Sequence, residues 1–158
     1  MSINETKEKI CTFFVSDYHF EMKSLPYIAK NLEKEKNIII LTENNLKETM
    51  EKLMARTNFD DLKKTKILNI NWENDDLRKF KEIKEDIKSE KETIIFIKGK
   101  KNYIQNVNKN LESWIENYDK VKIVDCYDME EIGENIDEIM SMYDKVLNTS
   151  GEKEIEKI

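Results

Sequence analysis

Residues 11–42 read CTFFVSDYHFEMKSLPYIAKNLEKEKNIIILT, and this stretch decides the fold. An apolar run at Cys11–Ser16 precedes a segment whose apolar residues recur every three or four positions, and a second apolar run follows at Asn37–Thr42. Continuous apolar runs are typical of strands buried on both faces, and the spacing between them is typical of an amphipathic helix. The stretch therefore predicts a strand, a helix and a second, parallel strand.

The same pattern recurs along the rest of the chain. Further strand-like runs occupy Lys66–Asn71, Thr93–Lys98 and Val121–Asp125, and helical stripes occupy residues 22–32, 46–54, 77–87, 103–118 and 129–147. This alternation predicts a three-layer α/β fold, with a five-stranded, mostly parallel sheet and helices on both faces. We expect a single domain over residues 1–147 and a charged C-terminal tail over residues 148–158.

Composition excludes several classes of site. The 158 residues include three glycines, one histidine and two cysteines. The glycines are too few and too scattered for GxGxxG, GxSxG or an intact GxxxxGK[ST] motif. A single histidine, His19, and two distant cysteines, Cys11 and Cys126, exclude a multi-histidine metal centre and a paired CxxC zinc site. We expect the two cysteines at opposite ends of the sheet, too far apart for a disulfide.

Charge and hydropathy limit the partners. The net charge of −6 argues against a general nucleic-acid binder, because such proteins normally carry a basic surface. The longest aliphatic runs, Ile38–Leu41 and Ile94–Ile97, are too short to span a membrane, and the polar N-terminus does not resemble a signal peptide. We therefore expect a cytoplasmic protein without a membrane partner.

The segment Ser16–Ser24 follows the first predicted strand, and we expect it to be a loop. Ser24 is then the N-cap of the next helix, with Pro26 in the first helical turn. Its length matches GxxxxGK[ST], with Asp17 and Met22 where the glycines belong and Lys23-Ser24 at the end.

This order of motifs resembles the KaiC/RecA-like branch of the P-loop ATPases, and is similar in particular to the MEDS-type sensory domains of bacterial regulators. The resemblance implies the strand order 5-1-4-3-2, with strand one between strands four and five; a flavodoxin-like order is the alternative. It places Glu43 at the position of the family's water-activating glutamate. Neither Asn71-Trp72 nor Lys98-Gly99 supplies the magnesium-holding aspartate of that family.

Ligands of such sheets bind beside the carboxyl ends of the strands. The candidate binding residues are therefore Asp17, Tyr18, His19, Glu21, Lys23, Ser24, Glu43, Trp72 and Lys98. Asp17 and Glu43 form a pair of carboxylates only if their strands lie close together. His19 is either an acid–base group or a loop residue with a local hydrogen bond, and Lys98 either attracts a phosphate or is solvated beside the turn at Gly99.

These features predict a non-catalytic regulatory or sensory binding module with an eroded phosphate-binding loop, acting through a regulatory protein partner in bacteria. One alternative is a residual ATPase or phosphoryl-handling enzyme with Lys23, Glu43 and Lys98 in electrostatic roles. Another is a structural subunit of a homo-oligomer. We expect no catalytic residue, no metal and no cofactor beyond weak binding of a nucleotide or anion.

Overall fold

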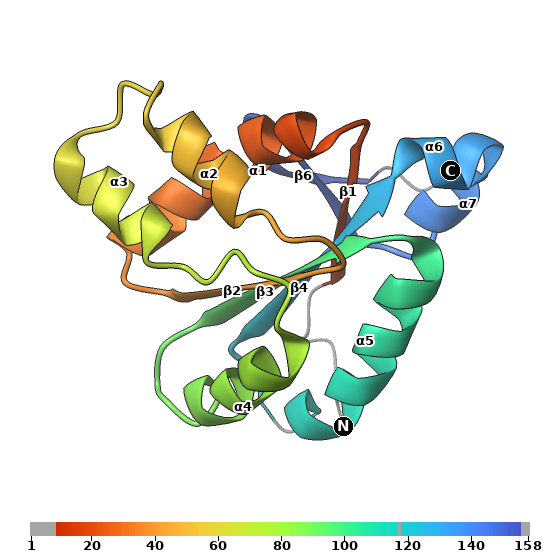
Figure 1. The fold of residues 1–158 in the computed structure, drawn as a ribbon. Helices are drawn as coiled ribbons and strands as arrows, with labels where there is room; N and C mark the ends of the chain where they lie inside the picture. The colour runs from red at the N-terminus through yellow and green to blue at the C-terminus, as the bar shows by residue number, and fades with distance from the viewer. Residues whose placement is uncertain (1–8, 117, 156–158) are drawn as a thin grey trace.

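The computed structural model describes residues 9–116 and 118–155, which form one mixed sheet between two helical layers (Figure 1). The sheet has the strand order β2-β3-β4-β1-β5-β6. Its strands are β1 (Lys9–Phe14), β2 (Asn37–Thr42), β3 (Thr93–Gly99), β4 (Val121–Asp128), β5 (Lys145–Asn148) and β6 (Gly151–Glu154). All neighbouring strands are parallel except β5 and β6, which pair antiparallel.

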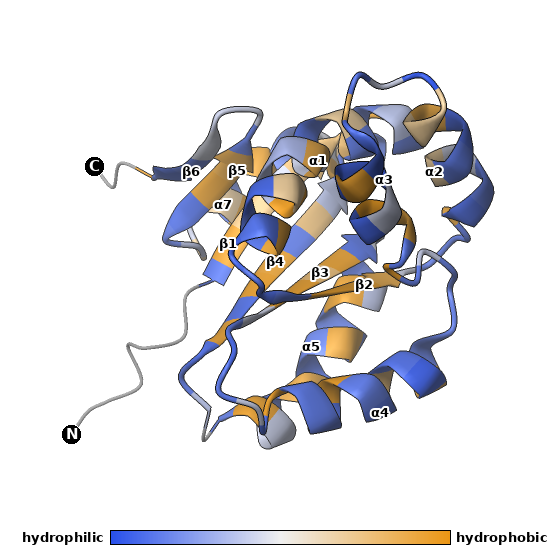
Figure 2. Ribbon diagram, turned by 90° about the vertical axis from the view of Figure 1, so that its left-hand side faces the viewer, coloured by the Kyte–Doolittle hydropathy of each residue, from blue (hydrophilic) through white to orange (hydrophobic). Residues whose placement is uncertain are grey.

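The helices divide between the two faces of the sheet. One face is covered by α1 (Asp17–Glu33), α2 (Lys47–Met54) and α3 (Asp61–Leu68), and the other by α4 (Asp76–Asp86), α5 (Lys101–Ile115), α6 (Met129–Ile132) and α7 (Ile136–Met140). Figure 2 shows apolar residues along the strands and on the inward sides of the helices. The α/β class predicted from the hydrophobic pattern is confirmed. None of the helices in the described residues is long and apolar enough to cross a membrane.

The prediction of a five-stranded sheet is wrong in three respects: the sheet has six strands, one predicted strand is absent, and the strand order differs. Residues 66–71, expected to form strand three, instead contain the end of α3, which Asp60 caps by accepting a hydrogen bond from the Lys63 N–H. No strand inserts between β2 and β3, which pair directly. Thr93–Lys98 lies next to β2 and β4 rather than next to strand one, so the order assigned to the predicted segments does not hold. Neither does the flavodoxin-like alternative.

The predicted last helix is also interrupted. Residues 129–147 form α6, a short 3₁₀ turn (Gly133–Asn135), α7 and the first part of β5. Gly133 has a φ of +52°, a conformation that favours glycine and ends α6. Residues 151–154 of the expected tail form β6, and residues 156–158 lie outside the described part of the chain.

The two cysteines are not at opposite ends of the sheet. In the β1–β4 ladder Thr12 pairs with Cys126, so Cys11 is one position away from it. Cys11 packs in the core under α5, whereas Cys126 packs in the core under α1. The side chains leave the sheet in opposite directions, because successive residues of a strand alternate between its faces. Neither cysteine forms a disulfide.

Candidate functional site

Three segments far apart in sequence meet where β2 and β3 end and α1 begins. Lys98, the penultimate residue of β3, donates to Asp17 Oδ1 at 2.7 Å and to Asn44 Oδ1 at 3.0 Å. The Asn44 amide donates in turn to Asp17 Oδ2 at 2.7 Å. We call Asp17, Asn44 and Lys98 the strand-end cluster. Two of the candidate residues predicted from the sequence, Asp17 and Lys98, thus form an ion pair.

Lys98 is the buried member of the strand-end cluster. Its side chain is 3% exposed, whereas that of Asp17 is 38% exposed. The ammonium also lies 4.6 Å from the centre of the Phe14 ring and 5.5 Å from that of Phe20, which places it over aromatic faces that attract cations. Asp17 and Asn44 thus supply the polar partners that a buried ammonium needs.

The predicted phosphate-loop segment is helical from its second residue. Helix α1 begins at Asp17, and its N-cap is Ser16, whose side chain accepts from the His19 N–H. Ser24 is not an N-cap, because it lies inside α1 and donates to the Phe20 carbonyl at 2.8 Å. Pro26 is also inside the helix. A backbone that is already helical has no row of loop N–H groups with which to wrap a phosphate.

Lys23, expected to reach toward a phosphate, turns instead toward the sheet. Its ammonium donates to the Phe13 carbonyl of β1 at 2.9 Å. Partial burial lowers the pKa of Lys23. The Lys23 ammonium is therefore bound within the chain, near the end of β1.

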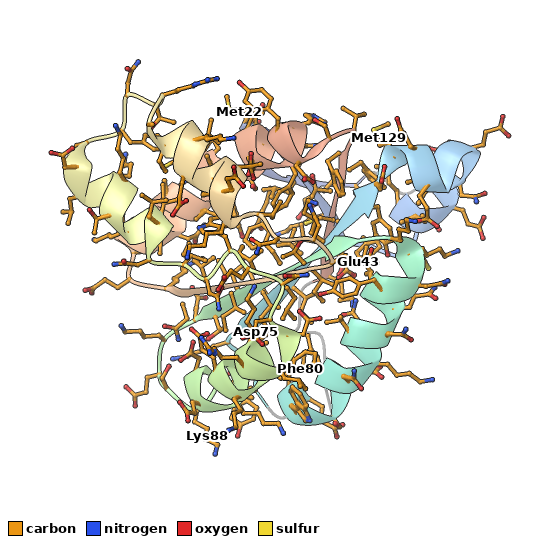
Figure 3. All side chains as sticks on the ribbon, viewed as in Figure 1. Met22, Glu43, Asp75, Phe80, Lys88 and Met129 are labelled. Atoms are coloured by element: carbon orange, nitrogen blue, oxygen red, sulfur yellow. The ribbon has the colours of Figure 1, made fainter. Side chains whose placement is uncertain are left out.

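The Glu43 carboxylate binds the start of α5 (Figure 3). Its carboxylate accepts from the Lys100 N–H at 2.6 Å, and Glu131 accepts from the Lys101 N–H at 2.9 Å. Both acids therefore satisfy the first N–H groups of α5 and interact favourably with its dipole. The two acids expected as a carboxylate pair thus bind different groups, since Asp17 is held by Lys98 and Glu43 by the Lys100 N–H.

The other predicted residues are divided between surface and core. Tyr18 is exposed, and the imidazole of His19 accepts from the Val15 N–H at 3.0 Å, which is the local hydrogen bond considered as one alternative. Glu21 is buried, accepts from the Thr49 hydroxyl at 2.8 Å, and has its pKa raised by burial. Trp72, expected to line the crevice, is a core residue whose indole N–H donates to the Ile67 carbonyl.

Sequence reasoning missed two groups of residues. Asn44, which completes the strand-end cluster, carries no signal beyond its position after β2. The second group surrounds Asp125, which is 1% exposed in the middle of β4 and accepts hydrogen bonds from Tyr143 and Asn108. An acid inside the apolar run VKIVD is unusual, and this was the available signal.

The described residues contain no cluster of histidine, cysteine, aspartate and glutamate suited to hold a metal ion. Comparison with family models, with curated proteins and with solved structures finds no match for the chain.

Proposed function

We propose that this chain is a non-catalytic regulatory binding module, related to the KaiC/RecA-like fold, that acts through a protein partner. The observation that carries the proposal is the ion pair between Lys98 and Asp17. A buried cation at the end of β3 is already paired with a carboxylate of the same chain. An incoming phosphate therefore meets a cation whose charge is neutralised.

The proposed family relationship rests on the position of β1, which lies between β4 and β5 when the observed strands are numbered in chain order, although this is not the order expected for the segments named from the sequence. In the KaiC/RecA-like ATPases that the sequence resembles, one strand of the sheet ends in an aspartate that holds Mg²⁺. Here β3 ends in Lys98-Gly99. The end of β3 therefore supplies no carboxylate ligand for Mg²⁺, which favours a binding role over hydrolysis.

Other groups that attract anions are also engaged within the chain. Lys23 donates to the Phe13 carbonyl, and the first N–H groups of α5 are bound by Glu43 and Glu131. These contacts occupy some of the donors that a helix N-terminus and a lysine would otherwise offer to a phosphate group. They disfavour the residual ATPase, which is the alternative proposed from the sequence.

The surface beside the strand-end cluster suits a protein partner. Val15, Tyr18, Met22 and Met129 are four of the eight large hydrophobic side chains found exposed in the described residues, with exposures of 56%, 63%, 45% and 38%. We call these four residues the rim surface. Figure 3 places Met22 and Met129 on the same side of the molecule. Methionine and tyrosine are enriched in protein interfaces, so the rim surface is the proposed contact.

Nucleotide titration tests the non-catalytic half of the proposal. Thermal unfolding is followed with Mg-ATP and Mg-GTP up to millimolar concentration, with phosphate release measured in parallel. We expect no saturable stabilisation and no release, whereas a bound nucleotide at a hundredfold excess over its Kd would stabilise the fold by ~2.7 kcal/mol. Saturable stabilisation that is lost in Lys98→Met but kept in Lys100→Met would overturn the proposal, because Lys100 is an exposed neighbour outside the ion pair.

Site-specific photo-crosslinking tests the partner half. A benzophenone amino acid replaces Tyr18 in the full chain in cells that express it, and as a control replaces Leu77, which is 81% exposed on α4. We expect one discrete product at position 18 that Met22→Glu abolishes. Equal products at both positions, or none, contradict a partner at the rim surface. A product containing two copies of this chain would favour the structural oligomer instead.

A further inference from the structure

A cavity of about 600 Å³ lies between α5, β4 and the segment after α7, on the face of the sheet opposite α1. Its walls include Ile104 from α5 and Val121 and Ile123 from β4. The volume falls within the range of small-molecule sites, which run from about 300 to 1,000 Å³. It is separate from the strand-end cluster and goes beyond the proposed function.

The polar end of this cavity is a network around Asp125. The Tyr143 hydroxyl donates to Asp125 Oδ2 at 2.5 Å, and the Asn108 amide donates to Asp125 Oδ1 at 3.0 Å. The hydroxyls of Tyr127 and Tyr143 lie 2.5 Å apart. Since Tyr143 donates its proton to Asp125, it accepts from Tyr127. All four residues line the cavity. The chain thus holds a carboxylate, with oriented tyrosines, at the edge of an apolar space.

Lys9 supplies the positive charge that faces this carboxylate. Its ammonium donates to Asn108 Oδ1 at 3.0 Å but lies 3.7 Å from Asp125 Oδ2, which is beyond a direct hydrogen bond. The Lys9 side chain is 40% exposed, whereas that of Asp125 is 1% exposed. The buried acid is therefore paired with a half-exposed cation that reaches solvent with little rearrangement.

We propose that the cavity binds a small organic ammonium ion with an aromatic or branched aliphatic body, whose ammonium displaces that of Lys9. Asn108 Oδ1 accepts a hydrogen bond from this ammonium, as it does from Lys9, and Asp125 supplies the opposite charge. The apolar body lies against Ile104 and Ile123. The remaining charged residues of the lining, Lys109, Glu112 and Glu116, leave a net charge of −1 with Lys9 and Asp125 included, which favours a cation.

Calorimetric titration of the full chain with 2-phenylethylamine tests the proposal, with 2-phenylethanol and 3-phenylpropanoate as neutral and anionic probes of similar size. We expect saturable binding of the amine alone. Lys9→Met removes the internal competitor and tightens binding by at least about fivefold, because an ion pair with a buried member is worth no less than the ~1 kcal/mol at the upper end for exposed pairs. Lys109→Met, which changes a lining lysine outside the Asp125 network, leaves the Kd unchanged. Asp125→Asn weakens binding at least about tenfold, because the charged acceptor is lost.

Several results would overturn the proposal. Binding to Lys9→Met but not to the natural chain means that Lys9 itself fills the position. Equal binding of the alcohol or the acid contradicts the ligand class, and an unchanged Kd in Lys9→Met contradicts displacement. Absence of binding in both chains excludes the site. If Asp125→Asn does not fold, the comparison of Lys9→Met with Lys109→Met decides the question.

Discussion

Asp17→Ala is expected to destabilise the fold far more than Lys98→Met, although both variants break the same ion pair. Removing Asp17 leaves an ammonium that is 3% exposed, with Asn44 as its remaining hydrogen-bond partner among the described residues. Breaking a fully buried pair costs about 3 to 5 kcal/mol and breaking an exposed one about 0 to 1. Since Asp17 is itself 38% exposed, we expect a loss of about 2 to 3 kcal/mol.

Lys98→Met removes the buried charge and leaves the partly exposed carboxylate of Asp17. That carboxylate stays in the first turn of α1, where the helix dipole favours it. Methionine fills much of the space beside Phe14 and Phe20. We therefore expect a change within about 1 kcal/mol, and the double variant should be close to Lys98→Met alone.

Urea denaturation at pH 7 measures all three variants. An Asp17→Ala loss below about 1 kcal/mol, or a Lys98→Met loss as large as that of Asp17→Ala, would refute the view that the carboxylate serves mainly to neutralise a buried cation. Inorganic phosphate provides a second readout. It should stabilise Asp17→Ala more than the natural chain or the double variant, which also correct for the general stabilisation by phosphate.

Three further changes test other parts of the fold. Lys79 is buried in α4 and donates to the Ile40 carbonyl at 2.6 Å, and burial lowers its pKa to about 8 from the usual 10.5. Between these two pKa values the unfolded chain binds more protons than the folded one, so stability rises with pH. The free energy of unfolding, measured with denaturant relative to Lys79→Met, should therefore increase by about 2 to 3 kcal/mol from pH 7 to pH 10. Gly99→Ala should lower the stability by about 1 to 3 kcal/mol, because a Cβ would lie 2.5 Å from Glu43 Oε1, and Glu43→Ala in the same chain should recover part of that loss in thermal unfolding. Trp72→Phe should cost about 1 to 3 kcal/mol in urea denaturation, since the indole N–H is lost and a buried carbonyl is left without its donor; an unchanged midpoint would contradict the core position of the indole.

The central strands were predictable because their burial dominates every competing preference. Asn37–Thr42 matches β2 exactly, and Thr93–Lys98 matches β3 to within one residue. The strand predicted for residues 66–71 was wrong because this segment has too few apolar residues to distinguish a buried strand from a short helix. On β2, which is at the edge of the sheet, the Ile40 carbonyl accepts a hydrogen bond from the Lys79 ammonium. A lysine from α4 thus makes a contact that a further strand would have made.

The beginning of α1 was mispredicted because two serines can both act as caps. Pro26 favoured Ser24, since proline is common in a first helical turn. In the structure Pro26 lies well inside α1, where its missing N–H leaves the Met22 carbonyl without its helical donor. Met22 is 45% exposed, so water reaches this turn. The cost of the proline is thereby reduced, and the helix extends back to Asp17.

Asp17 and Lys98 could each be named from sequence, but their contact could not, because it depends on that earlier helix start. Once α1 begins at Asp17, the carboxylate is held against Lys98 by the fold itself. Because Asp17 belongs to the same chain, its contact with Lys98 costs none of the translational freedom that a free phosphate loses on binding. A phosphate at millimolar concentration therefore does not displace Asp17 through Lys98 alone. It would need additional donors, and the Lys23 ammonium and the Lys100 N–H are bound within the chain. The position of the first turn of one helix thus determines whether this end of the sheet can bind an anion.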